Sequence, residues 1–184
     1  MLFRSTNAHF ASIGQYRHVE SLNYYQILQN QGETEAQALE TLAQRSRDNG
    51  RTPMQWDASA HAGFTTGTPW IGVVDNYRTI NAAAEVGDPD SIYTYYKQLV
   101  ALRKQHPVIQ SGQIEFLYKD DPDLLAYRRW DGQHELLVLC NLTRHDAPAA
   151  LPEGWQEARV LLGNYPDAAP GAALRPYEAL VLER

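Results

Sequence analysis

The sequence predicts an α+β fold, in which a helical first part is followed by an antiparallel β-sheet or sandwich. Between residues 19 and 105, three segments carry apolar residues at helical spacing. After residue 107 the apolar period changes to two, in five short segments separated by turns. The pair His106-Pro107 lies at this change, and the residue before a proline disfavours helix. We therefore expect two domains, residues 1–107 and 108–184.

Two helices are expected in the first fifty residues. Apolar residues at near-helical spacing define the first: Val19, Leu22, Ile27 and Leu28. Gly32 supplies its stop. Thr34 is a good N-cap for the second helix, and Gln37 three positions later completes the pattern of a capping box. The apolar stripe of the second helix consists of Ala38, Leu39, Leu42 and Ala43.

Residues 48–90 are predicted to form one long ordered loop. Turn-forming residues fill it, and its prolines Pro53 and Pro69 lack the amide donor that a strand needs. Loops of this length are usually functional or disordered. This one carries large apolar residues, which disordered segments avoid: Trp56, Phe64, Trp70, Ile71 and Tyr77. We therefore expect the loop to have a function.

A third helix and five strands complete the chain. The helix is expected at 92–105, with Ile92, Tyr96, Leu99 and Leu102 along one face. The segments of period two predict strands at 113–119, 124–130, 134–142, 157–163 and 178–184. Cys140 lies in the third strand and is interpreted as a buried core thiol, because a single cysteine forms no internal disulfide.

Composition excludes several classes of function. The net charge of −6 argues against a nucleic-acid-binding protein, which needs a basic face. The six histidines show no spacing typical of a metal site, and no nucleotide-binding or serine-hydrolase motif is present, so we expect no metal and no cofactor. No segment resembles a signal peptide or a membrane span, which favours a cytoplasmic location. Eleven Tyr and four Trp suit a sugar-binding surface, or ordinary core packing.

The acidic residues do not by themselves identify a catalytic reaction. The acidic cluster Asp120, Asp121 and Asp123 surrounds a proline between two expected strands, which is typical of a solvated hairpin turn. Glu20 and Asp48 stand near helix ends, where carboxylates cap helices or pair with arginines. No pair of catalytic carboxylates can therefore be named from spacing.

Two arginines in "SRDNGRTPMQWD" (46–57) are the remaining candidates. Arg47 follows the second helix and Arg51 comes four residues later. Guanidinium groups bind sugar hydroxyls and carboxylates with defined geometry. The residues alone allow two interpretations: the arginines bind a ligand, or they attach the long loop to acidic neighbours.

The motif SRDNGRTPMQWD, together with "AGFTTGTPWI" (62–71), resembles the oligo-1,6-glucosidase subfamily of the α-amylase family, glycoside hydrolase family thirteen. "QYRHVESLNYY", "DNYRTIN", the segment from Asp90 to Gly112 and "LRPYEALVLE" are similar to family segments too, so the likeness covers residues 7–184. Within the subfamily the chain is most similar to trehalose-6-phosphate hydrolases. It departs from the family pattern at His18, where Asp is usual, and at Gly50, where Ala or Ser is common.

This resemblance implies where each part of the chain belongs. Residues 1–107 would be the end of a (β/α)8 TIM barrel, with the long loop after the eighth strand and the helix at 92–105 as the last barrel helix. Residues 108–184 would be the C-terminal antiparallel β domain. By the same resemblance Arg47 would bind the hydroxyls of the substrate's sugar. Arg51, Trp56 and Asp57 would hold the loop.

The resemblance also implies what the chain lacks. The family's nucleophile, general acid and third carboxylate lie on the fourth, fifth and seventh barrel strands, and this chain is similar only to the part of the family after the eighth strand. We therefore expect a C-terminal part of a retaining α-glucosidase that acts on trehalose 6-phosphate and is inactive alone. The alternatives are an oligo-1,6-glucosidase fragment and a non-catalytic carbohydrate-binding or interaction module. Without a barrel, the stripe at 92–105 would be covered by self-association or by the first two helices.

Overall fold

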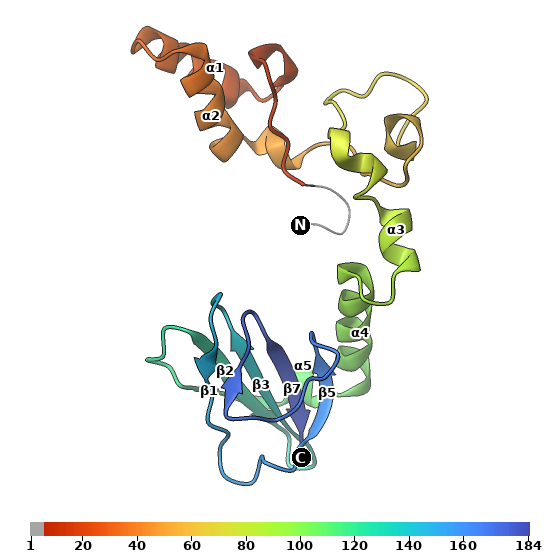
Figure 1. The fold of residues 1–184 in the computed structure, drawn as a ribbon, viewed down its shortest axis with the longest axis vertical. Coiled ribbons are helices and arrows are strands. Elements are labelled where there is room, and N and C mark those ends of the chain that lie inside the picture. The colour runs from red at the N-terminus through yellow and green to blue at the C-terminus, as the bar shows by residue number, and fades with distance from the viewer. Residues whose placement is uncertain (1–5) are drawn as a thin grey trace. The chain divides into compact units, whose positions relative to one another are not determined.

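The computed structural model describes residues 6–184, which fall into two compact units (Figure 1). The first unit ends at Thr94 and the second extends from Tyr95 to Arg184. The division by packing therefore lies inside the helix at 92–105. The predicted boundary between family segments, after residue 107, remains a prediction.

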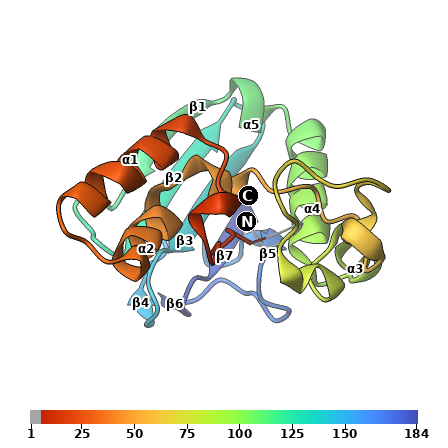
Figure 2. The ribbon, with the colours of Figure 1, turned by 90° about the horizontal axis from the view of Figure 1, so that it is seen from above.

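Two helices with a small apolar core form the start of the first unit. They are α1 (Val19–Asn30) and α2 (Glu35–Arg45), which lie side by side (Figure 2). Four of their buried residues, Tyr25, Leu28, Ala38 and Leu42, form one apolar cluster with Tyr16, which precedes α1. Both helices confirm the prediction, although Val19 and Ile27 of the expected stripe are exposed.

The ends of these helices form as the sequence predicts. Gly32 has a φ of +90°, the left-handed conformation that ends a helix at glycine. The Thr34 side chain accepts a hydrogen bond from the backbone N–H of Gln37, and the Thr34 N–H donates to the Gln37 side chain at 2.9 Å. The capping box therefore satisfies two backbone groups at the start of α2.

The long loop is built from short turns. Four-residue 3-10 turns occur at its start, Arg47–Gly50, and within it at Ala60–Gly63 and Asp75–Arg78. A three-residue turn of the same kind, Ile13–Gln15, precedes α1. A helix that the sequence did not predict, α3 (Ala82–Gly87), begins where the Asn81 side chain accepts a hydrogen bond from the N–H of Ala84 at 3.0 Å. Six residues are too few to show an amphipathic period, so only its Asn cap was a usable signal.

The third predicted helix is present as α4 (Ile92–Gln105), followed by the single turn α5 (Val108–Ser111). No residue of α4 is buried, and Tyr96 is 67% exposed. What covers the apolar stripe of α4, self-association or the first two helices, stays a prediction.

The second unit contains a five-stranded antiparallel sheet in the order β1-β2-β3-β7-β5. The strands are β1 (Gln113–Leu117), β2 (Leu124–Trp130), β3 (Glu135–Asn141), β5 (Arg159–Gly163) and β7 (Ala179–Glu183). All five lie within the predicted segments. A pair of two-residue strands, β4 (Ala147–Pro148) and β6 (Ala173–Leu174), was missed because two residues show no alternation.

An apolar core lies on one face of this sheet. Its ten buried residues are Leu124, Ala126, Leu137, Leu139, Ala147, Ala149, Trp155, Leu174, Leu180 and Leu182. Cys140 belongs to the other face, because successive residues of a strand point to opposite sides. Its thiol is only half-buried, which corrects the expectation of a core position, and this partial burial raises the pKa of Cys140.

The acidic cluster forms the predicted turn. Between β1 and β2, the Asp121 carboxylate accepts hydrogen bonds from the N–H groups of Asp123 at 2.9 Å and Leu124 at 3.2 Å.

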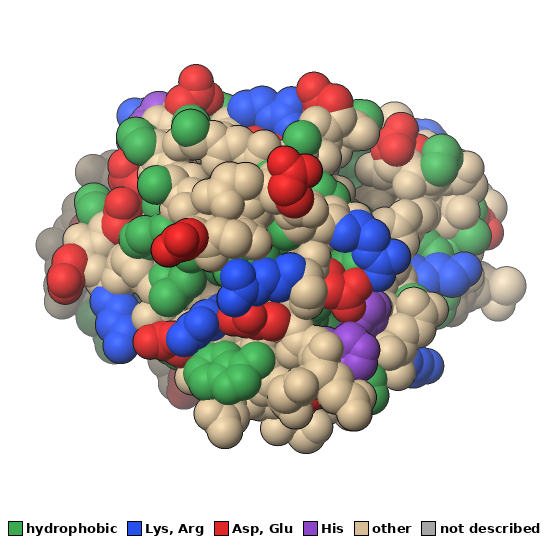
Figure 3. Space-filling model, turned by 90° about the horizontal axis from the view of Figure 1, so that it is seen from below, with side chains coloured by type: hydrophobic (Ala, Val, Ile, Leu, Met, Phe, Trp, Pro, Cys, Tyr) green, Lys and Arg blue, Asp and Glu red, His purple; other side chains and the backbone are tan. Residues whose placement is uncertain are grey.

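Over residues 6–184, no group of three or more His, Cys, Asp or Glu side chains is arranged to hold a metal ion. No helix in that range is long and apolar enough to cross a membrane. On the face drawn in Figure 3, basic side chains lie among acidic ones rather than in a separate patch.

Candidate functional site

The candidate site is a small cavity between the first turns of α1 and the end of α2. Its volume is 170 Å³ and its lining residues are His18, Glu20, Ser21, Tyr24, Leu42, Arg45, Ser46 and Arg47. It brings together Arg47 and Glu20, which lie 27 positions apart and were considered separately in the sequence. His18, Ser21 and Tyr24 were not identified as site residues, because no short-range motif connects α1 with the turn after α2.

Arg47 stands at the first position of the 3-10 turn Arg47–Gly50. The residue before it, Ser46, ends α2 by donating its N–H to the carbonyl of Leu42 at 2.8 Å. The Ser46 hydroxyl also accepts a hydrogen bond from the N–H of Asp48 at 3.2 Å. Arg47 itself is exposed, so its guanidinium is presented to solvent from a backbone that is fixed on both sides.

Asp48 organises the wall of the cavity. Its side chain is completely buried. One carboxylate oxygen, Oδ2, accepts hydrogen bonds from the backbone N–H groups of Arg17 and His18, each at 2.7 Å. The other oxygen lies 3.5 Å from Nη1 of Arg51. The sequence indicated a capping or pairing carboxylate, and the structure identifies its partners as the residues that lead into α1.

Buried amide side chains attach the loop to its surroundings. Asn49 donates to the carbonyls of Leu42 at 2.9 Å and Ala43 at 2.8 Å, which belong to the last turn of α2. Gln55, also fully buried, donates to Asn76 at 3.2 Å and to the carbonyl of Ile80. These bonds add donors to carbonyls at the end of α2 and in the loop, where the regular helical pattern stops.

Arg51 contributes to the loop rather than to the cavity. It forms the ion pair with Asp48, and its guanidinium carbon lies 5.4 Å from the centre of the Trp70 ring. Both contacts fit the structural role that the resemblance implied for Arg51. The ring of Trp70 is itself 62% exposed.

Trp56 and Asp57 lie at a strained turn. The N–H groups of both donate to the carbonyl of Ala62, at 2.9 Å and 3.3 Å. His61 and Ala62 have φ angles of 51° and 57°, and Gly63 follows at 66°. Consecutive left-handed residues are energetically unfavourable for side chains larger than glycine. The hydrogen bonds at Trp56 and Asp57 therefore help to hold a conformation that the chain would not adopt alone.

A larger cavity of 580 Å³ lies in the same unit. Its lining residues are Gly14, Gln15, Arg17, Ala60, His61, Thr68, Pro69, Trp70, Gly72, Val73, Asp75 and Tyr77. Through Nη1, Arg17 donates to the carbonyls of Gly14 at 2.5 Å and Tyr16 at 2.9 Å. Its guanidinium is therefore partly used in holding the backbone that precedes α1.

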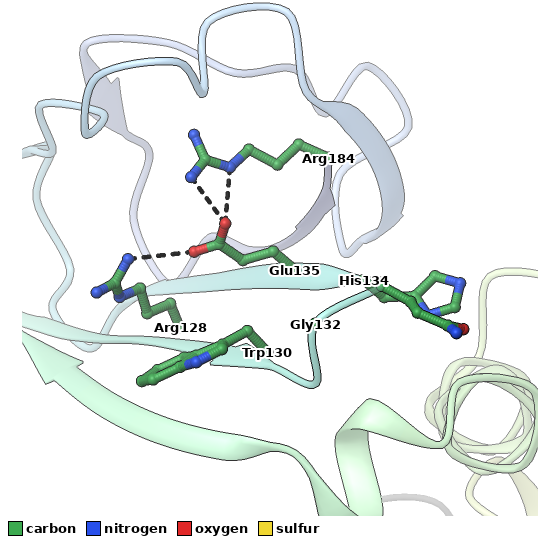
Figure 4. Close-up of a pocket in the computed structure, with 7 residues that line it drawn as sticks. Arg128, Trp130, Gly132, His134, Glu135 and Arg184 are labelled. Atoms are coloured by element: carbon green, nitrogen blue, oxygen red, sulfur yellow. Dashed lines mark hydrogen bonds and ion pairs between the residues drawn. The ribbon is translucent and has the colours of Figure 1, made fainter.

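In the second unit, a cavity of 490 Å³ lies at the β2–β3 hairpin (Figure 4). There the Glu135 carboxylate lies between two arginines, at 3.2 Å from Arg128 and 2.7 Å from Arg184. The Arg128 guanidinium also lies 4.9 Å from the centre of the Trp130 ring. Arg128 pairs with Glu115 as well, at 2.6 Å, so two carboxylates match the two arginines and little charge is left unpaired. The ion pairs connect the hairpin to the residue after the last strand.

Comparison with known proteins identifies the class of this chain. The alpha-amylase catalytic domain family matches residues 6–112, more than half of the chain. The chain therefore belongs to the α-amylase family, as the RDNGRTPMQWD motif had indicated.

Individual relatives agree with this assignment. The chain is 42% identical to trehalose-6-phosphate hydrolase of Bacillus subtilis over 96% of its own length, and 44% identical to that of Escherichia coli over 95%. It is 40% identical to an oligo-1,6-glucosidase of Halalkalibacterium halodurans over 96%. The crystal structure of Bacillus licheniformis trehalose-6-phosphate hydrolase matches 96% of the chain with a TM-score of 0.88 and 41% identity.

The chain is much shorter than these relatives. It spans 32% of the B. subtilis and E. coli proteins and 33% of the B. licheniformis structure. The chain is thus similar to about a third of each of these family members, and this third includes an antiparallel sheet.

Proposed function

We propose that this chain is the C-terminal part of a retaining α-glucosidase that hydrolyses trehalose 6-phosphate to glucose and glucose 6-phosphate. In this proposal residues 1–107 supply the end of the catalytic barrel, with α4 as its last helix, and residues 108–184 form the C-terminal β domain. The identities of 42% and 44% to trehalose-6-phosphate hydrolases support this substrate.

One observation carries the proposal: the exposed Arg47 lines a cavity and extends from a turn whose backbone is fixed by buried contacts. A guanidinium group offers several N–H donors in a fixed plane, which suits adjacent hydroxyl oxygens of a sugar ring. Glu20, on the same cavity, is an acceptor for further hydroxyl groups. Arg47 thus binds the sugar in our proposal, while the reacting groups come from elsewhere.

Retaining hydrolysis needs two carboxyl groups. One attacks the anomeric carbon, the other protonates the leaving oxygen, and water then releases the sugar from the covalent intermediate. In this proposal both groups lie on barrel strands that are not part of the third of the family to which this chain is similar. Arg47 contributes by orienting the substrate, an effect that accelerates a reaction only when the reacting groups are present. The chain alone is therefore inactive, and its partner is the remainder of the barrel or, failing that, a second copy of the chain.

An oligo-1,6-glucosidase is the second candidate, because relatives of that name are 40% identical over nearly the whole chain. The two candidates share Arg47 and differ in the sugar beyond it. Hydrolysis of isomaltose in preference to trehalose 6-phosphate would favour this alternative.

The proposal is tested with two proteins. The purified chain should release no glucose from trehalose 6-phosphate or from an aryl α-glucoside. A hybrid enzyme, in which this chain replaces the matching third of the B. subtilis trehalose-6-phosphate hydrolase, should hydrolyse trehalose 6-phosphate. In the hybrid, Arg47→Gln should lower kcat/KM by about 100-fold, the scale of a lost charge-assisted hydrogen bond to substrate.

Saturable glucose release by the chain alone would contradict the inactivity. Arg78→Gln is the matched control, because this arginine lies outside the cavity and stacks on its neighbour Tyr77 at 5.2 Å. An equal loss in the Arg47 and Arg78 variants would contradict the specific role of Arg47.

A further inference from the structure

We propose that Asp48 is a positioning residue for Arg47, because its buried carboxylate fixes the start of α1 against the turn that carries the guanidinium. The effect of Asp48 on substrate binding rests on the proposed sugar-binding role of Arg47. The link between Asp48 and the start of α1 depends only on contacts within residues 16–51.

The contacts of Asp48 join two segments that are distant in sequence. Arg17 and His18 donate their backbone N–H groups to the same oxygen from positions 31 and 30 residues earlier in the chain. Hydrogen bonds to an ionised acceptor are stronger than neutral ones. A buried carboxylate that lost these donors would be left without adequate solvation, which is costly. The start of α1 therefore cannot move away from Asp48 without a large penalty.

The cavity has two walls, and Asp48 connects them. His18, Glu20, Ser21 and Tyr24 form the wall on the side of α1, while the wall at the end of α2 consists of Leu42, Arg45, Ser46 and Arg47. A second connection joins the hydroxyls of Ser21 and Ser46 at 2.8 Å. Because Arg47 is adjacent to Asp48 in one 3-10 turn, fixing Asp48 also fixes the backbone from which the Arg47 side chain extends.

The two carboxylate oxygens of Asp48 have different partners, so two substitutions at this position should have different effects. Oδ2 accepts the two backbone N–H groups, whereas Oδ1 faces the Arg51 guanidinium at 3.5 Å. In Asp48→Asn, the amide oxygen can still accept both N–H groups, but its NH₂ group then faces a cation. In Asp48→Ala both sets of contacts are lost. Asp48→Asn should therefore retain the link to α1 better than Asp48→Ala.

The first experiment measures the structural link in the 184-residue chain itself. Amide hydrogen exchange, followed by NMR, should show that Asp48→Ala accelerates exchange at Arg17 and His18 by at least about 10-fold, the equivalent of one lost hydrogen bond. Asp48→Asn should accelerate it less. Asp120→Ala is the matched control, because Asp120 is exposed in the β1–β2 turn. Unchanged exchange at both amides in Asp48→Ala would overturn the link.

The second experiment is a double-mutant cycle in the hybrid enzyme. Misplacement of a binding group by about 1 Å costs up to ~100-fold in rate. Asp48→Ala should therefore lower kcat/KM for trehalose 6-phosphate by about 10- to 100-fold when Arg47 is present. In the Arg47→Gln background the same substitution should have almost no further effect, since residues that act through one another are not additive.

The outcomes separate the two proposals. The same fold-loss with and without Arg47 would overturn the positioning role, because Asp48 would then act independently. A hybrid without activity, or an Arg47→Gln variant without effect, would contradict the proposed function, while amide exchange would still decide the structural link. If Asp48→Ala does not fold, the same cycle with Asp48→Asn should show a smaller loss that again requires Arg47.

Discussion

The two units of this chain are stabilised in different ways. The second unit has a sheet with ten buried core residues, among them Trp155, and its strands pair with one another. The first unit has a core cluster of five buried residues, and much of its chain is turns. There, buried polar side chains such as Asp48, Asn49 and Gln55 hold distant segments together. Apolar burial is non-directional, whereas each hydrogen bond fixes one particular pair of atoms.

This difference suits the proposed roles of the two units. A site that binds a sugar needs side chains held at defined positions, and directional contacts supply this more readily than apolar packing. The first unit also leaves the hydroxyl of Tyr16 and the side-chain oxygens of Asn49, Thr52 and Gln55 buried without hydrogen-bond partners among the described residues. A few such groups per hundred residues are usual in native proteins, so the polar framework is about as complete as in a typical interior.

The largest effect on stability is expected for Trp155→Ala, which tests whether the second unit depends on apolar packing. Trp155 is 2% exposed, and the Arg184 guanidinium lies 4.8 Å from its ring centre. Removal of a buried indole should lower the free energy of unfolding by about 4 kcal/mol, because it leaves a cavity in the core. Urea denaturation, followed through the NMR signals of β3, measures this change. A loss below about 1 kcal/mol would contradict a second unit that depends on apolar packing.

A smaller effect is expected for Asn49→Ala in the first unit. The substitution removes the side-chain donor from the carbonyls of Leu42 and Ala43, of which Leu42 keeps the Ser46 N–H, at a cost of about 2 kcal/mol. Amide exchange within α2 should accelerate accordingly. Asn30→Ala, at the exposed end of α1, is the matched control and should change stability little. If both substitutions have the same effect, the buried amide does not stabilise the turn as we infer.

The smallest expected effect is on the pH dependence of stability. Hydrogen bonds from the Arg175 side chain lower the pKa of Glu178 in the folded state. A carboxyl whose folded pKa is depressed stabilises the fold at pH values above its unfolded pKa and loses this contribution as pH falls through the folded value. Melting temperatures should therefore fall more steeply below pH 4.5 in the wild type than in Glu178→Gln. Parallel curves for the two proteins would show that this pair does not couple stability to pH.

Much of the fold was predictable because its signals are local. The caps of α2 at Thr34 and Gln37, the stop at Gly32 and the alternation of the five strands each depend on residues close in sequence. The short elements α3, α5, β4 and β6 were missed because they contain too few residues for a period to appear. The predicted stripe of α1 was partly wrong, since burial of Val19 and Ile27 depends on tertiary neighbours that spacing does not specify.

The candidate site was predictable only in part. The RDNGRTPMQWD motif singled out Arg47 through its resemblance to a family, and its sugar-binding role stays a prediction. The contacts of Asp48 with Arg17 and His18 cross some thirty residues of chain. No pattern within one short segment encodes such a contact, so the positioning of the site required the structure.

The turn at residues 57–63 has a consequence for sequence variation. A Cβ atom at Gly63 would lie 2.7 Å from Oδ2 of Asp57, and Gly63 also has a φ of +66°. Any other residue at 63 would therefore meet both a steric clash and backbone strain. A library randomised at position 63 alone should return almost only glycine. If position 57 is varied as well, a smaller side chain there can remove the clash, but the backbone strain at position 63 remains. Asparagine, which tolerates this conformation best among larger residues, would then be the first substitution to appear.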